Sequence, residues 1–215
     1  MYSKVVESII ENKLIVIVRN VEKEKILPLA QAMYDGGIRL LEVTYDASKK
    51  ISDAETAENI RLLAEHFEDK MFIGAGTVLT TEQVELTEQA GGRFIISPNT
   101  DKAVIEKTRE LGMVSMPGAV TPTEIQLAHT YGASFVKLFP AGDLGPGYVK
   151  AVKAPLSHIM LTAVGGINDA NIPDYVKVGV SGFGVGTNIV DKKLLAANDY
   201  DGIRELAKRY VEVLQ

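Results

Sequence analysis

One lysine stands inside a short apolar stretch, where an ammonium group would be poorly solvated. The stretch is "SFVKLF", residues 134–139, and the lysine is Lys137. Burial among apolar side chains disfavours the charged form of an amine and lowers its pKa. A neutral lysine amine is a nucleophile that can attack a ketone and form a Schiff base. This residue in this setting therefore indicates covalent chemistry on a carbonyl compound.

A glutamate has a similar setting in a second apolar stretch. In "RLLEVTY", residues 39–45, Glu42 shares a strand face with Leu40 and Thr44, because strand side chains alternate between faces. A buried carboxyl group holds its proton to higher pH and can move protons beside a reacting amine. Neither the Schiff base nor the proton transfer requires a metal or an organic cofactor. The alternative is a structural ion pair between Lys137 and Glu42.

Short apolar stretches alternate with helical patterns from end to end. We predict strands within residues 14–18, 39–45, 71–76, 93–97, 113–118, 134–139, 159–166 and 182–186. Helical patterns cover residues 1–13, 22–35, 53–66, 81–90, 101–111, 121–131, 145–154, 168–178 and 201–214. This alternation favours parallel pairing, and the count matches a single α/β domain over residues 1–215, a compact (β/α)8 TIM barrel with an N-terminal helix. An open doubly wound sheet is the alternative, although "RNVEKEK" lacks the glycine pattern of a dinucleotide site.

Composition excludes several classes of protein. The chain has 215 residues, 46% of them hydrophobic, and a formal net charge of -5, so we expect no general affinity for nucleic acid. It has no cysteine, which excludes disulfides, thiolate metal sites and a cysteine nucleophile, and fits a cytoplasmic location. The first residues are too charged for a signal peptide, and we expect no membrane span.

Two late segments place glycines where a strand ends and a helix should begin. They are "TAVGGIND", residues 162–169, and "GFGVGTNIV", residues 182–190. Glycine lets the backbone approach a ligand closely, and free N–H groups at such turns bind anions. Barrels that bind phosphate commonly use the loops after their last two strands. We therefore predict a phosphate site there, with simple tight turns as the alternative.

Taken in order, these stretches resemble the class I aldolases that act on 2-keto-3-deoxy-6-phosphogluconate and 4-hydroxy-2-oxoglutarate. The resemblance covers nearly the whole chain and lies in "IVIVRN", "GGIRLLEVT", "IGAGTVLT", "FIISPN", "SMPGAVTPTE", "FVKLFPAGDLGPGYVKA", "VGGI" and "GVGTNIV". It implies a homotrimer of barrels, no cofactor and no metal. The implied substrate is a small phosphorylated keto acid, cleaved to pyruvate and glyceraldehyde 3-phosphate, with 4-hydroxy-2-oxoglutarate cleaved to pyruvate and glyoxylate.

The resemblance also implies roles for single residues. The Schiff-base lysine falls on Lys137 and the proton-transferring glutamate on Glu42. The remaining positions are predicted to bind substrate: the pyruvoyl group at Arg19, Thr77, Pro98 and Phe139, and the phosphate at Gly165, Gly166, Gly186 and Thr187.

Two positions depart from the family pattern. Many members have an arginine soon after the "EVT" strand end, whereas here the stretch is "TYDASKKISDAE", in which Lys49 or Lys50 could substitute. Gluconate-type members usually have threonine where this chain has Val164, beside the C4 hydroxyl of the substrate. Valine resembles the aldolases of the C4 epimer, 2-keto-3-deoxy-6-phosphogalactonate. The gluconate epimer is our first prediction and the galactonate epimer the alternative.

Two further hypotheses remain open from the sequence. A phosphosugar-binding sensor or scaffold would keep the glycine loops without an inward lysine. A phosphosugar isomerase or synthase on the same fold would share the phosphate loops without an amine nucleophile. Lys137 together with Glu42 favours the aldolase over both.

Overall fold

Parallel strands form one sheet that curves into a barrel, as seen in a computed structural model that describes residues 1–215. The order across the sheet is β5-β4-β3-β2-β1-β9-β8-β7-β6, and every neighbouring pair is parallel. The strands are β1 (Leu14–Val18), β2 (Leu40–Thr44), β3 (Phe72–Gly76), β4 (Phe94–Ile96), β5 (Val114–Met116), β6 (Gly118–Ala119), β7 (Val136–Leu138), β8 (Leu161–Val164) and β9 (Gly182–Val185).

The barrel closes within one short stretch of chain. The two ends of the sheet are β5 and β6, and only Pro117 separates them. Proline has no N–H to donate to a ladder, so it divides the strand predicted at 113–118 into two pieces that pair with different neighbours. The (β/α)8 prediction is thus confirmed, and the open doubly wound sheet is wrong.

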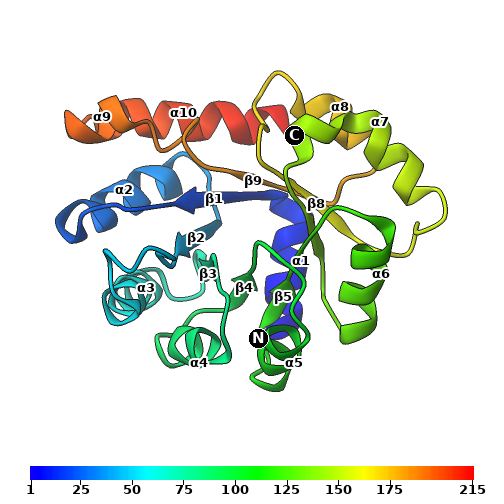
Figure 1. The fold of residues 1–215 in the computed structure, drawn as a ribbon. Coiled ribbons are helices and arrows are strands. Elements are labelled where there is room, and N and C mark those ends of the chain that lie inside the picture. The colour runs from blue at the N-terminus through cyan, green and yellow to red at the C-terminus, as the bar shows by residue number, and fades with distance from the viewer.

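Helices cover the outside of the barrel, apart from the first helix, which lies behind the strands at one end (Figure 1). They are α1 (Tyr2–Asn12), α2 (Lys23–Asp35), α3 (Asp53–Phe67), α4 (Thr81–Gln89), α5 (Lys102–Glu110), α6 (Pro122–Tyr131), α7 (Ala141–Lys153), α8 (Ile172–Lys177), α9 (Lys192–Ala196) and α10 (Tyr200–Val213). Side chains define several of the starts. Ser52 and Glu55 form a capping box before α3, and Thr121 and Glu124 form another before α6.

Three helices differ from the sequence prediction. Helix α8 begins at Ile172, four residues after the start of the range predicted at 168–178. Helix α7 begins at Ala141, whereas the pattern predicted 145–154. Gly145 has non-helical dihedrals (φ 77°, ψ 163°) and is followed by Pro146. Because glycine and proline usually interrupt a helix, the sequence pattern did not predict the turn that precedes them. Helix α9 was not predicted, because it is short and begins with two lysines. Its start is held by Asp191, whose carboxylate accepts from the backbone N–H groups of Lys193 and Leu194.

The apolar core has two layers, one on each side of the strands. The outer layer lies between strands and helices and includes Val136 and Leu138, whereas Phe135 belongs to the inner layer. The alternation predicted for "SFVKLF" therefore holds. Helix α1 adds Val5 and Ile9 to the inner layer, and Figure 1 shows α1 behind the strands in the middle of the barrel. Helix α1 thus closes one end of the interior.

No helix combines the length and the apolar character that crossing a membrane requires.

Candidate active site

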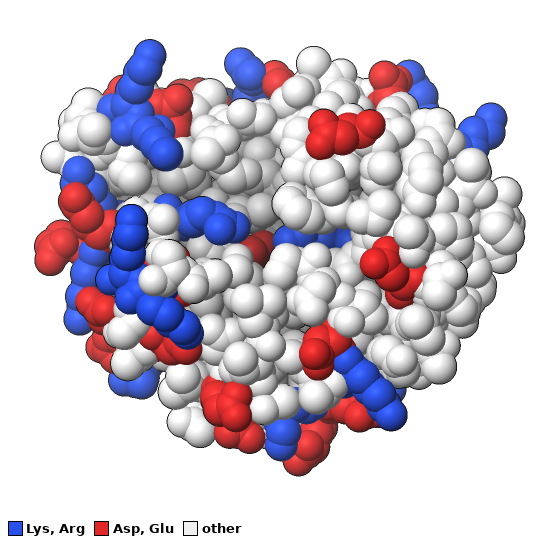
Figure 2. Space-filling view, viewed as in Figure 1, with Lys and Arg blue, Asp and Glu red and all other residues white.

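Glu42 and Lys137 both line one cavity of about 470 Å³ at the carboxyl ends of the strands. Glu42 lies in the middle of β2 and is 2% exposed, and Lys137 lies in the middle of β7 and is 8% exposed. Figure 2 shows a hollow in the middle of this face, with basic and acidic atoms in its depth. Active sites of (β/α)8 enzymes lie at this end of the barrel.

Two glycines, Gly76 and Gly184, leave space for the side chains of Glu42 and Val164, which line the cavity. A Cβ on Gly76 would overlap the Glu42 carboxylate, so β3 must carry glycine where the glutamate lies. A Cβ on Gly184 would lie 2.8 Å from Cγ2 of Val164. Both contacts would be closer than a normal van der Waals contact. Larger residues at Gly76 or Gly184 would therefore displace Glu42 or Val164.

Burial dominates the electrostatics of the pair. It raises the pKa of Glu42, an effect that the charges of Lys137 and Arg19 partly oppose. Burial lowers the pKa of Lys137, although the negative charge of Glu42 acts in the opposite direction. The ion pairs with N···O distances up to 4.0 Å all join other side chains. Lys137 and Glu42 thus share a cavity without forming the direct ion pair of the alternative hypothesis.

Three predicted substrate-binding side chains share the cavity with the lysine. Nζ of Lys137 lies 4.9 Å from the centre of the Phe139 ring. In the same cavity, Nη2 of Arg19 donates to Oγ1 of Thr77 at 3.5 Å. Thr77 has φ 56°, an unusual value for a β-branched residue, and such backbone strain is concentrated at functional sites. This strained turn presents the Thr77 side chain to Arg19.

The two glycine loops lie at the same mouth of the barrel. Gly165 and Gly166 follow β8 with φ 85° and 72°, values that favour glycine. Asn188, from the loop after β9, donates its side-chain N–H to the carbonyl of Ile167 at 3.1 Å and so joins the two loops. The backbone N–H groups of Gly166 and Thr187 donate to no acceptor of the protein. Free N–H groups in glycine turns are what an anion requires.

The structure brings all the predicted site residues to this cavity. Its lining includes Arg19, Glu42, Thr77, Pro98, Lys137, Phe139, Val164, Gly165, Gly166, Gly186 and Thr187. Sequence reasoning missed Ile17, Ile167, Gly184, Val185 and Asn188, which also line it. Strand alternation could have found two of them, because Ile17 lies two residues before Arg19 and Gly184 two before Gly186.

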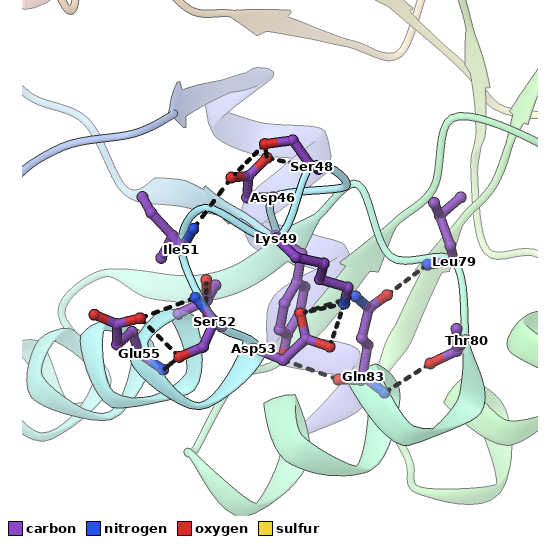
Figure 3. Close-up of polar contacts among 12 residues, drawn as sticks. Asp46, Ser48, Lys49, Ile51, Ser52, Asp53, Glu55, Leu79, Thr80 and Gln83 are labelled. Atoms are coloured by element: carbon purple, nitrogen blue, oxygen red, sulfur yellow. Dashed lines mark hydrogen bonds and ion pairs between the residues drawn. The ribbon is translucent and has the colours of Figure 1, made fainter.

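Neither Lys49 nor Lys50, the two lysines of the loop after β2, lines the cavity. Figure 3 shows Lys49 next to Asp53. Nζ of Lys49 instead lies 2.8 Å and 2.7 Å from the two carboxylate oxygens of Asp53. Asp46 organises the loop by accepting hydrogen bonds from Ser48 and from the backbone N–H groups of Lys50 and Ile51. These bonds lower the pKa of Asp46 to about 2. The loop is therefore closed on itself rather than directed at the cavity.

Helix α4 ties this loop to the rest of the barrel. Nε2 of Gln83 donates to Asp53 at 3.3 Å, and Oε1 of Gln83 accepts from the N–H of Leu79 at 2.8 Å. Figure 3 shows Gln83 between the loops that follow β2 and β3. No group of three or more histidine, aspartate or glutamate side chains is arranged to hold a metal ion.

The barrel and its cavity define an enzyme of the (β/α)8 class with an inward lysine and glutamate. Comparison with known proteins identifies the family. The family model "KDPG and KHG aldolase" matches residues 5–206. A "Probable 2-dehydro-3-deoxy-6-phosphogalactonate aldolase" of Rhizobium meliloti is 38% identical over 180 residues, which are 83% of this chain and 82% of that one.

Two further relatives support the same assignment. A 2-dehydro-3-deoxy-phosphogluconate aldolase of Haemophilus influenzae is 31% identical over 99% of this chain and 97% of that one. The solved KDPG aldolase of Legionella pneumophila, titled as holding pyruvate as a covalent carbinolamine intermediate, superimposes with a TM-score of 0.85. It is 29% identical, over 94% of this chain and 96% of that one. The chain belongs to the KDPG and KHG aldolase family, and it is an aldolase, a carbon–carbon lyase.

Proposed function

We propose that the protein is a class I aldolase that cleaves 2-keto-3-deoxy-6-phosphogalactonate to pyruvate and glyceraldehyde 3-phosphate through a Schiff base on Lys137. The observation that carries the proposal is the buried lysine in the phosphate-loop cavity, with Glu42 beside it and no direct salt bridge between them. The solved Legionella relative supports it, because its title describes covalently captured pyruvate.

The chemistry follows from the two pKa directions. The lowered pKa of Lys137 supplies a free amine, which attacks the C2 carbonyl; water leaves and an iminium forms. The iminium withdraws electrons from the C3–C4 bond, which breaks as the C4 hydroxyl loses its proton to Glu42. C3 then regains a proton, and water releases pyruvate from Lys137. The raised pKa of Glu42 suits a group that must both accept and return a proton.

The cavity can also orient the two ends of this substrate. We expect Arg19 and Thr77 to bind the carboxylate end, because the guanidinium of Arg19 lines the same cavity as the lysine. We expect the free N–H groups of Gly166 and Thr187 to bind the phosphate end. The substrate would then span the cavity with its C2 carbonyl next to Lys137.

The choice of epimer rests on Val164, which lines the cavity at the end of β8. A threonine there could donate a hydrogen bond to one orientation of the C4 hydroxyl, and valine cannot. The sequence placed the gluconate epimer first. The phosphogalactonate relative, at 38% identity, and the valine together favour the galactonate epimer instead. The gluconate epimer is the second candidate, supported by the relative from Haemophilus influenzae, and 4-hydroxy-2-oxoglutarate is proposed as a further substrate.

Two measurements test this function. Borohydride reduction with pyruvate should add mass to the peptide that holds Lys137, and labelling of another lysine would overturn the Schiff base. Cleavage of both phosphorylated epimers should then be measured side by side.

Val164→Thr tests how the epimer is chosen. We expect the wild type to cleave the galactonate epimer at least as well as the gluconate epimer. The substitution should move the ratio of kcat/KM toward the gluconate epimer by about tenfold, or about 1.4 kcal/mol. A wild type already strict for the gluconate epimer would show that Val164 is not the selector.

The homotrimer implied by the resemblance is also a proposal. Light scattering of the purified protein should give a mass near three times the chain mass of 23.3 kDa.

A further inference from the structure

A second cavity adjoins the first on the side of β1 and β9. Its volume is about 390 Å³, and Ile17, Arg19, Gly186 and Thr187 line both cavities. The remaining wall comes from the loop between β1 and α2, from Lys25 of α2, from Val190 and from α9, the short helix that sequence reasoning missed. The two hollows therefore meet at the loop proposed to bind the phosphate end of the substrate.

The lining of this second cavity combines an apolar wall with a basic rim. The apolar residues are Ile17, Val21, Val190, Leu195 and Ala196. The charged residues are Arg19, Lys25, Lys192 and Glu22, so cations outnumber the single carboxylate. A ligand that matches this lining has an apolar chain and an anionic end.

Lys25 has a structural role in the wall, and Lys192 does not. Nζ of Lys25 donates to the carbonyl of Leu195 at 3.4 Å and lies 3.6 Å from a carboxylate oxygen of Glu22. It thereby joins α2 to α9. Lys192 is exposed at the first position of α9, and the ion pairs and side-chain hydrogen bonds of the chain do not include its ammonium group. It is the cation of the rim that remains available to a ligand.

We propose that this second cavity is an extended acceptor subsite, which receives the far end of aldehydes that have an apolar chain and a terminal anionic group. The inference rests on the proposed Schiff-base function. In the direction of addition, C3 of the pyruvate enamine bonds to the aldehyde carbon and the aldehyde oxygen takes a proton. Water then releases the product from Lys137. An acceptor longer than glyceraldehyde passes Gly186 and Thr187 and enters the apolar space between α2 and α9.

The test compares addition of pyruvate to propanal, hexanal and 6-oxohexanoate. For the wild type, we expect kcat/KM to rise about tenfold from propanal to hexanal, the effect of filling an apolar pocket. 6-Oxohexanoate should gain about a further threefold, the size of an exposed charge pair. Equal values for all three acceptors would overturn the proposal.

Two substitutions on α9 locate the effect. Lys192→Glu should remove the advantage of 6-oxohexanoate over hexanal, and Leu195→Gln should remove that of hexanal over propanal. Neither should change the reaction with propanal. Lys193→Glu is the matched control, because Lys193 is the next residue of α9 and does not line the cavity. Equal effects of Lys192→Glu and Lys193→Glu would contradict the subsite.

Failure of the subsite and failure of the aldolase function can be told apart. If borohydride traps pyruvate on Lys137 but kcat/KM is the same for all three acceptors, only the subsite is overturned. Absence of the trapped adduct in the wild type would overturn the proposed function and the subsite with it.

Discussion

Two regions of the molecule differ in how their titratable groups are satisfied. One is the cavity that holds Glu42 and Lys137, and the other is the loop from Asp46 to Asp53. In the cavity, burial raises the pKa of Glu42 and lowers that of Lys137, so it favours the neutral form of each group. No direct ion pair forms between them. In the loop, hydrogen bonds lower the pKa of half-buried Asp46, and Lys49 pairs with Asp53. Titratable groups that are satisfied by local partners build structure, whereas titratable groups that are buried without a direct ion pair are available for chemistry.

The largest expected effect comes from removing the amine. Lys137→Ala should abolish cleavage and borohydride trapping, because no other lysine lines the cavity. Lys137→Arg should do the same, since a guanidinium remains protonated and is a poor nucleophile. The checks are turnover and the mass of the trapped peptide. Residual turnover in the alanine variant above that of a protein-free control would contradict the proposed role of the Lys137 amine.

Glu42→Gln tests the acid in the same cavity. We expect pyruvate still to be trapped while turnover falls by about 10²–10⁴-fold, the usual contribution of general acid–base catalysis. The negative charge of Glu42 raises the pKa of Lys137, so its removal lowers that pKa further. The pH profile of imine formation, which depends on free amine, should therefore shift to lower pH. Near-normal turnover would assign Glu42 a structural role.

Gly76→Ala tests the space that holds the carboxylate. The added methyl group would overlap Glu42, and a displacement of about 1 Å in a catalytic group can cost about 10²-fold in rate. Gly147→Ala is the matched control, because a Cβ there meets nothing within 4 Å. Equal kcat values for the two variants would show that the position of Glu42 is not set by Gly76.

The smallest effect is expected in the loop. Asp46→Asn should leave turnover within about twofold, because Asp46 does not line the cavity. Its carboxylate has a pKa of about 2 when folded and near 3.9 in an unfolded chain, so its contribution to stability is present above about pH 4. That contribution is lost as the pH falls toward 2. Urea unfolding of wild type and variant should therefore converge over this range, and a constant gap would exclude the ionic contribution.

The sequence anticipated the parts of the molecule that depend on periodicity. Alternation along β2 and β7 predicts that Glu42 and Lys137 face the inside of the barrel, because a period of two gives a strand only two faces. Features that depend on contacts between residues far apart in the sequence, or on a single capping side chain, were not predicted. Pro117 divides a strand because its two halves pair with different neighbours, and α9 needs the carboxylate of Asp191 to start a helix at two lysines.

The site shows the same division. The residues recognised by motif line the cavity, but the second cavity depends on α2 and α9 meeting through Lys25, a contact between residues 170 apart in sequence. The role suggested for Lys49 was also beyond the sequence, because its partner depends on how the loop turns back to Asp53.

The position of α1 has a kinetic consequence. Val5 and Ile9 occlude the amino-terminal end of the barrel interior, so both products must leave through the entrance by which the substrate arrived. In the proposed mechanism, the pyruvate fragment is still covalently held on Lys137 when the C3–C4 bond has broken, whereas the aldehyde fragment is already free. We therefore expect release in a compulsory order, aldehyde before keto acid. In the reverse direction, pyruvate should then bind to the free enzyme first. Glyceraldehyde 3-phosphate should bind productively only to enzyme that already carries pyruvate.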